Sequence, residues 1–294
     1  MDENASLIER FEEDRVRLRA VAYRMLGSVS EADDAVQETW LRLSRTDADS
    51  VQNLGAWLTT VVSRVCLNLL RSRDHRREEP LEFHEPDPAL GRPAGIDPEQ
   101  EALMADSVGL ALLVVLDTLT PPERLAFVLH DMFTVPFDEI APLIERSPAA
   151  TRQLASRARR RVKGGVAVPD ADLTRQRRVV DAFLAATRGG DFDALVALLH
   201  PDVVLRADRS VVPTPEPIVF SGAQTVAKGA MAAMERAQST VTALVNGTVG
   251  LAMAPLGRLF LVLDFTITDD RITEIDVIAD PDGLRQVDLA VLDN

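Results

Sequence analysis

The sequence of 294 residues has few of the groups that build disulfide-linked or thiolate metal sites. It contains one cysteine, Cys66, so neither a disulfide within the chain nor a cluster of thiolate ligands can form. Cys66 lies in the apolar stretch VVSRVCLNLL, where a small buried residue is expected rather than a reactive thiol. We therefore expect no metal site and no cofactor.

Long apolar segments are also missing. The run VGLALLVVL (residues 108–116) has about half of the ~20 residues that a membrane helix needs. The N-terminus is acidic and lacks the apolar core of a signal peptide. These features predict a cytoplasmic protein without a membrane partner.

A surplus of basic residues is absent as well. The chain has 32 Lys and Arg against 46 Asp and Glu, which gives a net charge of −14. This sign disfavours non-specific DNA binding, because such binding rests on neutralising phosphates. The distribution of charge is uneven, however: residues 146–163 contain seven basic side chains and no acidic one.

Composition divides the chain into successive domains. Helical periodicity covers residues 5–79 and returns over residues 103–163, with an acidic, proline-rich linker at 80–102 between them. Residues 171–294 mix helical and strand patterns and are predicted to be α+β. The elements expected there are helices at 171–188 and 191–199, strands at 202–207, 240–245, 258–267 and 271–279, and turns at Asn246-Gly247 and Asp269-Asp270.

Residues 137–162 have the pattern of a helix-turn-helix. Serine is a favoured N-cap and proline suits the first helical position, so the second helix is expected to begin at Ser147-Pro148. Its apolar stripe consists of Thr151, Leu154, Ala158 and Val162. A basic second helix after a tight turn is the geometry that enters the major groove of DNA. A basic helix packed on an acidic neighbour is the alternative.

The candidate DNA contacts share one side of this second helix or its start. They are Ser147, Ala149, Ala150, Arg152, Gln153, Ser156, Arg157 and Arg160.

Two helices of the first domain carry opposite charge. The stretch SVSEADDAVQETWLRL predicts a helix capped by Ser30, with Asp34, Gln37 and Glu38 on its polar face. An acidic face does not bind DNA, so it indicates a partner with a basic patch or simply a solvated surface. The following helix ends in the basic residues Arg71, Arg73, Arg76 and Arg77. Cations stabilise a helix C-terminus, and four in seven residues also suit a phosphate backbone.

Taken in order, these segments resemble the extracytoplasmic-function (ECF) group of the sigma-70 family. The resemblance rests on EADDAVQETWLRL, AWLTTVVSRVCLNLLRSR, the linker, LDTLTPPERLAFVLHDMF and the helix-turn-helix, and covers residues 5–163. It implies that residues 5–79 are region 2, which binds polymerase and the −10 element. Residues 103–163 would be region 4, which reads the −35 element.

The same resemblance implies partners and residue roles. Asp34, Gln37 and Glu38 would face the β′ clamp helices of core RNA polymerase, and region 4 would meet the β flap. The residues implied for −10 DNA are Asn53, Trp57, Arg64, Asn68, Arg71 and Arg73. Family members often carry Asp at position 68, where this chain has Asn68. A monomer is expected.

The C-terminal part resembles SnoaL-like domains of the NTF2-like fold, a cone of curved sheet surrounded by helices. The resemblance rests on residues 179–208 and on ITEIDVIADPDGL (272–284). Asp280, Pro281, Asp282, Gly283 and Leu284 stand where related sigma factors often have the motif NPDKL, and DRSVV (208–212) stands where they often have DGGGK. The resemblance implies a regulatory module that contacts the sigma domains or binds a small apolar ligand in its cone.

Three functions follow from these patterns. The first is a sigma factor that directs core RNA polymerase to promoters without catalysing a reaction, under control of its C-terminal domain. The second is a ligand-gated helix-turn-helix regulator with an NTF2-like sensor, for which the acidic helix has no use. The third is an enzymatic C-terminal domain, and it is disfavoured because His200 has no convergent acid or base in the sequence. Asp264 and Asp276 could face a pocket or solvent.

Overall fold

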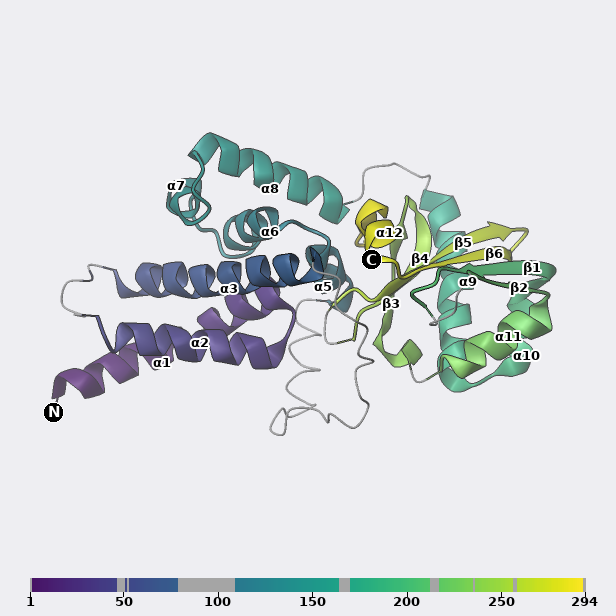
Figure 1. The fold of residues 1–294 in the computed structure, drawn as a ribbon, viewed down its shortest axis with the longest axis horizontal. Coiled ribbons are helices and arrows are strands. Elements are labelled where there is room, and N and C mark those ends of the chain that lie inside the picture. The colour runs from purple at the N-terminus through teal and green to yellow at the C-terminus, as the bar shows by residue number, and fades with distance from the viewer. Residues whose placement is uncertain are drawn as a thin grey trace. The chain divides into compact units, whose positions relative to one another are not determined.

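A computed structural model describes most of the chain, namely residues 2–46, 51, 53–78, 109–163, 170–211, 217–234, 236–255 and 258–292. Its contacts divide the chain into two compact units. The first consists of Met1–Gly109 with Leu119–Arg159, and the second of Leu110–Thr118 with Arg160–Asn294. The N-terminal part is helical and the C-terminal part contains a sheet with helices (Figure 1).

Every described element of the first unit is helical. Its α-helices are α1 (Asp2–Leu26), α2 (Val29–Leu43), α3 (Leu54–Glu78), α6 (Pro121–Phe127), α7 (Phe137–Ile140) and α8 (Pro148–Lys163), whose last turn belongs to the second unit. A π-helical turn (Val128–Met132) follows α6 and a 3-10 turn (Ala141–Leu143) follows α7.

Helices α1, α2 and α3 pack against one another through apolar faces. Gly27, with φ of 74°, ends α1 and leaves Ser28 extended, so Ser28 caps α2 by accepting the Glu31 N–H at 3.4 Å. The cap predicted at Ser30 is therefore wrong by two residues. In α2, Ala32, Val36 and Leu43 are buried.

Helix α6 docks on α1 and α3 through a buried arginine. The Arg124 side chain is 1% exposed, and its Nε donates to the Arg24 carbonyl oxygen near the end of α1 at 3.1 Å. A cation is favourable at the C-terminus of a helix, where backbone carbonyls lack helical partners. The Arg24 guanidinium in turn lies 5.3 Å from the ring centroid of Phe133.

The second unit contains a mixed sheet of seven strands in the order β2-β1-β6-β5-β4-β3-β7. The strands are β1 (Leu199–Ala207), β2 (Ile218–Ser221), β3 (Thr240–Val245), β4 (Thr248–Met253), β5 (Leu261–Thr268), β6 (Arg271–Ile278) and β7 (Leu289–Ala290). Only the β1–β6 pair is parallel. The helices are α5 (Leu110–Asp117), α9 (Asp170–Gly189), α10 (Phe192–Leu198), α11 (Ala223–Ala232) and α12 (Pro281–Gln286), with a 3-10 turn at Arg236–Ser239.

Alternating residues of the strands feed two apolar clusters, one on each face of the sheet. Leu251 and Phe265 join a cluster with residues of α9, α10 and α11, such as Phe183. Ala252 and Val262, which pair with each other across β4 and β5, join a second cluster with Val114 and Val115 of α5 and the partly buried Leu284 of α12. A strand period of two places successive side chains on opposite faces, so both faces are covered over β4 and β5.

The structure confirms the predicted fold class, helical portions followed by an α+β domain. Both predicted turns have positive φ values, at Asn246-Gly247 and at Asp269-Asp270. The sequence patterns missed the strands β2, β4 and β7 and the helices α11 and α12.

The predicted boundary at residue 103 lies outside the described residues, and Leu110–Thr118 group with the C-terminal sheet. Helix α5 is apolar around its circumference, and such a helix is stable only when it is covered on all sides.

Candidate nucleic-acid interface

Helices α7 and α8 form the predicted helix-turn-helix. The turn contains Glu145 with φ of 54°, so glutamate occupies the left-handed position that glycine often takes. Ser147 caps α8 by accepting the Ala150 N–H at 3.2 Å. Thr151, Ala155 and Ala158 form the fully buried stripe, so Ala155 joins the predicted stripe while Leu154 is half-buried.

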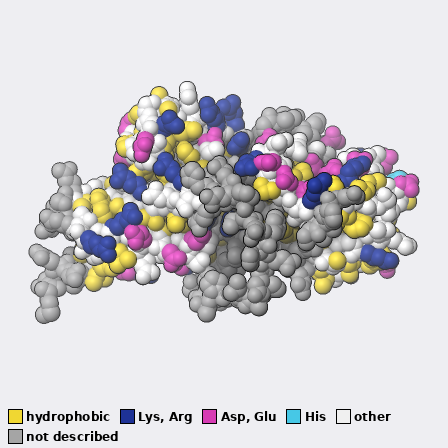
Figure 2. Space-filling model, in the orientation of Figure 1, with side chains coloured by type: hydrophobic (Ala, Val, Ile, Leu, Met, Phe, Trp, Pro, Cys, Tyr) yellow, Lys and Arg dark blue, Asp and Glu magenta, His cyan; other side chains and the backbone are white. Residues whose placement is uncertain are grey.

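The structure brings most of the predicted −35 contacts to the exposed side of α8. Exposed residues are Ser147, Ala149, Arg152, Gln153, Ser156, Arg157 and Arg160, and Ala150 is half-buried. Basic side chains gather over α8 in Figure 2. No acidic residue lies on the helix, so this face presents positive charge and hydrogen-bond donors.

Two arginines of α8 are held by residues that the sequence patterns did not single out. The Arg152 guanidinium carbon lies 5.3 Å from the ring centroid of Phe137. The Phe137 ring also stacks on His130, with centroids 3.8 Å apart. Arg159 Nε donates to Asp131 Oδ1 at 2.6 Å. Sequence spacing gave no signal for these pairs, since the partners come from different helices.

A second row of predicted DNA contacts lies along α3. Asn53, Arg64, Asn68 and Arg71 are exposed and Trp57 is half-buried. Within the described part of the chain, no hydrogen bond or ion pair involves Arg64 or Arg71. Positions 53, 57, 64, 68 and 71 recur at helical spacing, so they share one side of the helix.

Arg73 differs from this row because it points toward α1 and α2. Its guanidinium donates to the Leu26 carbonyl oxygen at 3.2 Å and pairs with Glu31, and its side chain is 11% exposed. Arg76 and Arg77 have no described side chains. The DNA role of Arg73 remains a prediction, and the contacts seen here fasten α3 to the end of α1.

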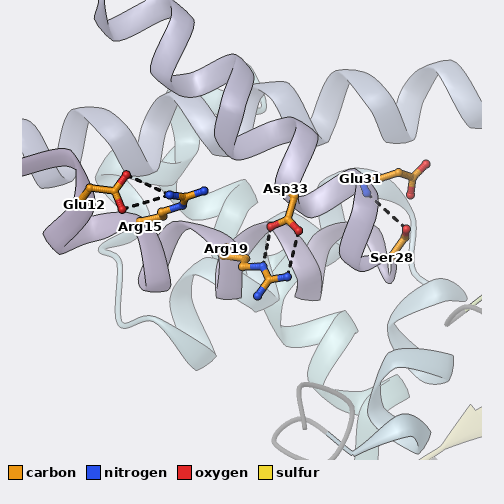
Figure 3. A network of polar contacts seen from close by, with 6 residues as sticks. All are labelled: Glu12, Arg15, Arg19, Ser28, Glu31 and Asp33. Atoms are coloured by element: carbon orange, nitrogen blue, oxygen red, sulfur yellow. Dashed lines mark hydrogen bonds and ion pairs between the residues drawn. The ribbon is translucent and has the colours of Figure 1, made fainter. Parts of the chain in front are cut away.

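The acidic face of α2 is arranged as the sequence indicated. Asp34 and Gln37 are exposed, and half-buried Glu38 accepts from Arg42 Nε at 2.9 Å. Asp33 lies beside them, but its carboxylate accepts two hydrogen bonds from Arg19 and thereby links α2 to α1 (Figure 3). Asp34 and Gln37 are thus available to a partner.

The two sequence motifs of the C-terminal domain meet in the structure. Asp208 Oδ2 accepts the backbone N–H groups of Ala279 and Asp280, at 2.5 and 2.7 Å. The Asp280 carboxylate then caps α12 by accepting from the backbone of Asp282 and Gly283. Leu284 packs into the cluster that contains α5. The segment 280–284 is therefore a structural junction between β1, β6 and α12.

The candidate enzymatic residues have structural partners. His200 Nδ1 accepts the Asp202 N–H at 3.2 Å. Asp264 and Asp276 lie opposite each other on β5 and β6, where Asp264 accepts from Asn246 and Asp276 pairs with Arg206 at 3.6 Å. Among the described residues, no group of three or more potential metal ligands comes together.

Buried apolar side chains pack between the sheet and α9–α11, and a hollow of about 410 Å³ is lined by residues of α10, α11 and β1. A hollow of about 550 Å³ lies elsewhere, beside α12, and its lining includes Arg206, Asp276 and Val287. The apolar ligand predicted for the cone remains a prediction.

Cys66 lies on the inner side of α3 and is fully buried. Burial raises the pKa of its thiol to about 12, since a thiolate would lose its hydration there. None of the described helices is long and apolar enough to span a bilayer.

Comparison with known proteins agrees with this geometry. Two family models match the chain. The model of Sigma-70 region 2 matches residues 10–76, and the model of Sigma-70 region 4 matches residues 109–162. The chain belongs to the ECF RNA polymerase sigma factors, which confirms the sigma-factor assignment in the first of the three hypotheses.

Its relatives include two sigma factors of Mycobacterium tuberculosis. The ECF RNA polymerase sigma factor SigJ is 37% identical, over 94% of this chain and 92% of its own. The probable ECF sigma factor SigI is 32% identical, over 92% of each chain. The crystal structure of SigJ covers 94% of this chain and 97% of its own at 35% identity, with a TM-score of 0.45.

Proposed function

We propose that this chain binds core RNA polymerase in the cytoplasm and directs it to promoters through two surfaces. The exposed side of α8 reads the −35 element in the major groove, and the row along α3 handles the −10 element. Asp34, Gln37 and Glu38 face the β′ clamp helices. The chain acts stoichiometrically and turns over no substrate.

The observation that carries the proposal is the exposed, acid-free side of α8. Arg152, Gln153 and Arg157 stand there on the outer side of a capped helix, whose inner side packs through Thr151, Ala155 and Ala158. Arginine and glutamine are the side chains that pair with guanine and adenine edges in the major groove. A rigid helix behind them supports accurate placement.

The C-terminal domain modulates this activity, and α5 is the element through which it acts. Residues 110–117 fall within the match to region 4, yet Val114 and Val115 pack in a cluster with β3, β4, β5 and β7. The Leu259 N–H donates to Asp117 Oδ2 at 3.0 Å, and the Val291 N–H donates to the Val162 carbonyl oxygen at the end of α8 at 3.0 Å. These contacts join α5 and the last turn of α8 to the segments that flank β5 and β7, all within the second unit.

The main test is in vitro transcription with core polymerase, the full chain and a promoter library. We expect run-off transcripts only when polymerase and the chain are both present. Absence of transcripts across the library would contradict the sigma-factor activity. Tight binding to duplex promoter DNA by the chain alone would favour a ligand-gated regulator instead, since the net charge of −14 disfavours such binding.

Modulation is tested in the full chain by a pair of matched core substitutions. Leu289→Ala opens a cavity in the cluster that holds α5, whereas Leu195→Ala opens one in the other cluster. We expect Leu289→Ala to change transcript yield and Leu195→Ala to leave it near the wild-type level, at a temperature where both variants are folded by circular dichroism. Equal effects of the two variants would contradict a role for α5.

A further inference from the structure

The ring of Phe137 contacts two residues: Arg152 of α8 and His130, which precedes the helix-turn-helix. Phe137 is the first residue of α7 and is half-buried, while Ile140 provides the buried contact of that short helix. The Arg152 guanidinium from α8 lies over the ring, with its carbon 5.3 Å from the centroid. A cation within about 6 Å of an aromatic centroid is attracted by the ring quadrupole.

His130 is the second residue that contacts the Phe137 ring. The imidazole and phenyl rings have centroids 3.8 Å apart and planes at 27°. His130 is itself fixed, because its Nδ1 lies 3.0 Å from the Val135 carbonyl oxygen. The Phe137 ring therefore stands in a defined orientation before Arg152 packs on it.

We propose that Phe137 is a positioning residue for −35 recognition, because its ring sets the direction in which Arg152 extends from α8. This inference rests on the proposed role of α8. A free arginine side chain has several rotatable bonds and loses conformational entropy when it is fixed. Bidentate recognition of a guanine edge also requires the guanidinium plane in one orientation. A guanidinium held over the Phe137 ring in advance loses less entropy and has fewer orientations to choose from when DNA arrives.

The effect is confined to one side chain. In the described part of the chain, Arg157 and Arg160 have no hydrogen bond, ion pair or ring contact. Removal of the Phe137 ring should therefore weaken the base preference that depends on Arg152. Contacts from the rest of α8 should remain, as should the positive charge of Arg152.

The experiment measures base preference at each −35 position, by run-off transcription with holoenzyme on a library randomised in that element. The variants are Phe137→Leu, Phe137→Met, which retains more side-chain volume without a ring, and Phe137→Tyr, which retains the ring. Phe133→Leu is the matched control, since Phe133 lies under Arg24 and not under a residue of α8. Thermal melting confirms that each variant is folded.

We expect Phe137→Leu and Phe137→Met to reduce the preference at one −35 position about threefold, the range expected from an exposed cation–π contact. Phe137→Tyr and Phe133→Leu should match the wild type. The salt dependence of promoter binding should stay unchanged in the Phe137 variants, because they retain every positive charge of α8.

Two results would overturn the inference while leaving the proposed function intact. One is a wild-type preference in both ring-less variants, although Arg152→Ala loses it. The other is a uniform loss of transcription across all −35 sequences, which indicates a purely structural role. If Arg152→Ala changes no −35 position, both the assignment of Arg152 to base reading and this inference fail.

Discussion

Helices α3 and α8 both expose a row of arginines and amides, but they hold these residues differently. Arg64 and Arg71 of α3 have no hydrogen bond or ion pair within the described residues. On α8, the Arg152 guanidinium lies over the Phe137 ring and Asp131 pairs with Arg159, whereas Arg157 and Arg160 have no such contact within the described residues. A side chain held in advance loses less conformational entropy on binding, which suits recognition of a base edge by Arg152. The two rows thus combine similar residue types with different degrees of preorganisation.

The largest expected effect comes from a base-reading arginine of α8. Arg157→Ala should weaken −35-dependent transcription by about 1–3 kcal/mol, because a lost bidentate contact leaves a base edge unpaired. Holoenzyme run-off assays on matched and scrambled −35 elements measure it. Arg209→Ala, which removes an exposed arginine from the C-terminal unit, is the control. An unchanged promoter preference in Arg157→Ala would count against the recognition-helix assignment.

A charge-conserving pair of substitutions separates the two rows. Arg152→Lys should lose preference at its −35 position by about threefold or more, since lysine lacks the planar guanidinium that can pair with two atoms of a base edge. Arg64→Lys should retain promoter opening, because a point charge satisfies a phosphate. Opening is followed by permanganate reactivity at the −10 element. If Arg152→Lys and Arg64→Lys reduce transcription equally, the two helices do not differ in how they hold their arginines.

A smaller effect is expected when Arg159 is released from Asp131. Asp131→Asn should lower stability by about 0.2–1 kcal/mol, the usual value of a surface ion pair, and should raise promoter affinity slightly at low salt. The base preference should not change. Thermal melting and salt titrations measure these quantities. Glu12→Gln, which breaks the exposed pair with Arg15, serves as control and should affect melting alone.

The thiol of Cys66, on the inner side of α3, is not expected to react with thiol reagents in the native protein. The pKa of Cys66 is raised to about 12 by burial, whereas an unfolded thiol titrates near pH 8.5. The unfolded chain therefore loses its thiol proton first, and the stability contributed by the neutral thiol is complete below about pH 8.5 and falls as pH rises above it. Thiol-reagent labelling at pH 8 should proceed only in denaturant. Rapid labelling of the native protein would show that α3 is not packed as described.

Local patterns were sufficient for much of the fold and the site. The stripe of α8, the exposed arginines and the turns at Asn246-Gly247 and Asp269-Asp270 follow from spacing and backbone preference. The strand β4 was missed because TVGLAM is covered on both faces, so it lacks the alternation that marks a half-exposed strand. The cap of α2 shifted to Ser28 because Gly27 ends the preceding helix there.

The sequence by itself determined which helix is basic, which face of it is exposed and which family the chain resembles. These properties depend on residue type and periodicity along a short segment. Only the tertiary structure decided that α5 packs on the C-terminal sheet, that Arg124 is buried at the end of α1, and that Phe137 lies under Arg152. Each of these contacts joins residues from different elements, and their pairing depends on how apolar faces and charges pack in three dimensions.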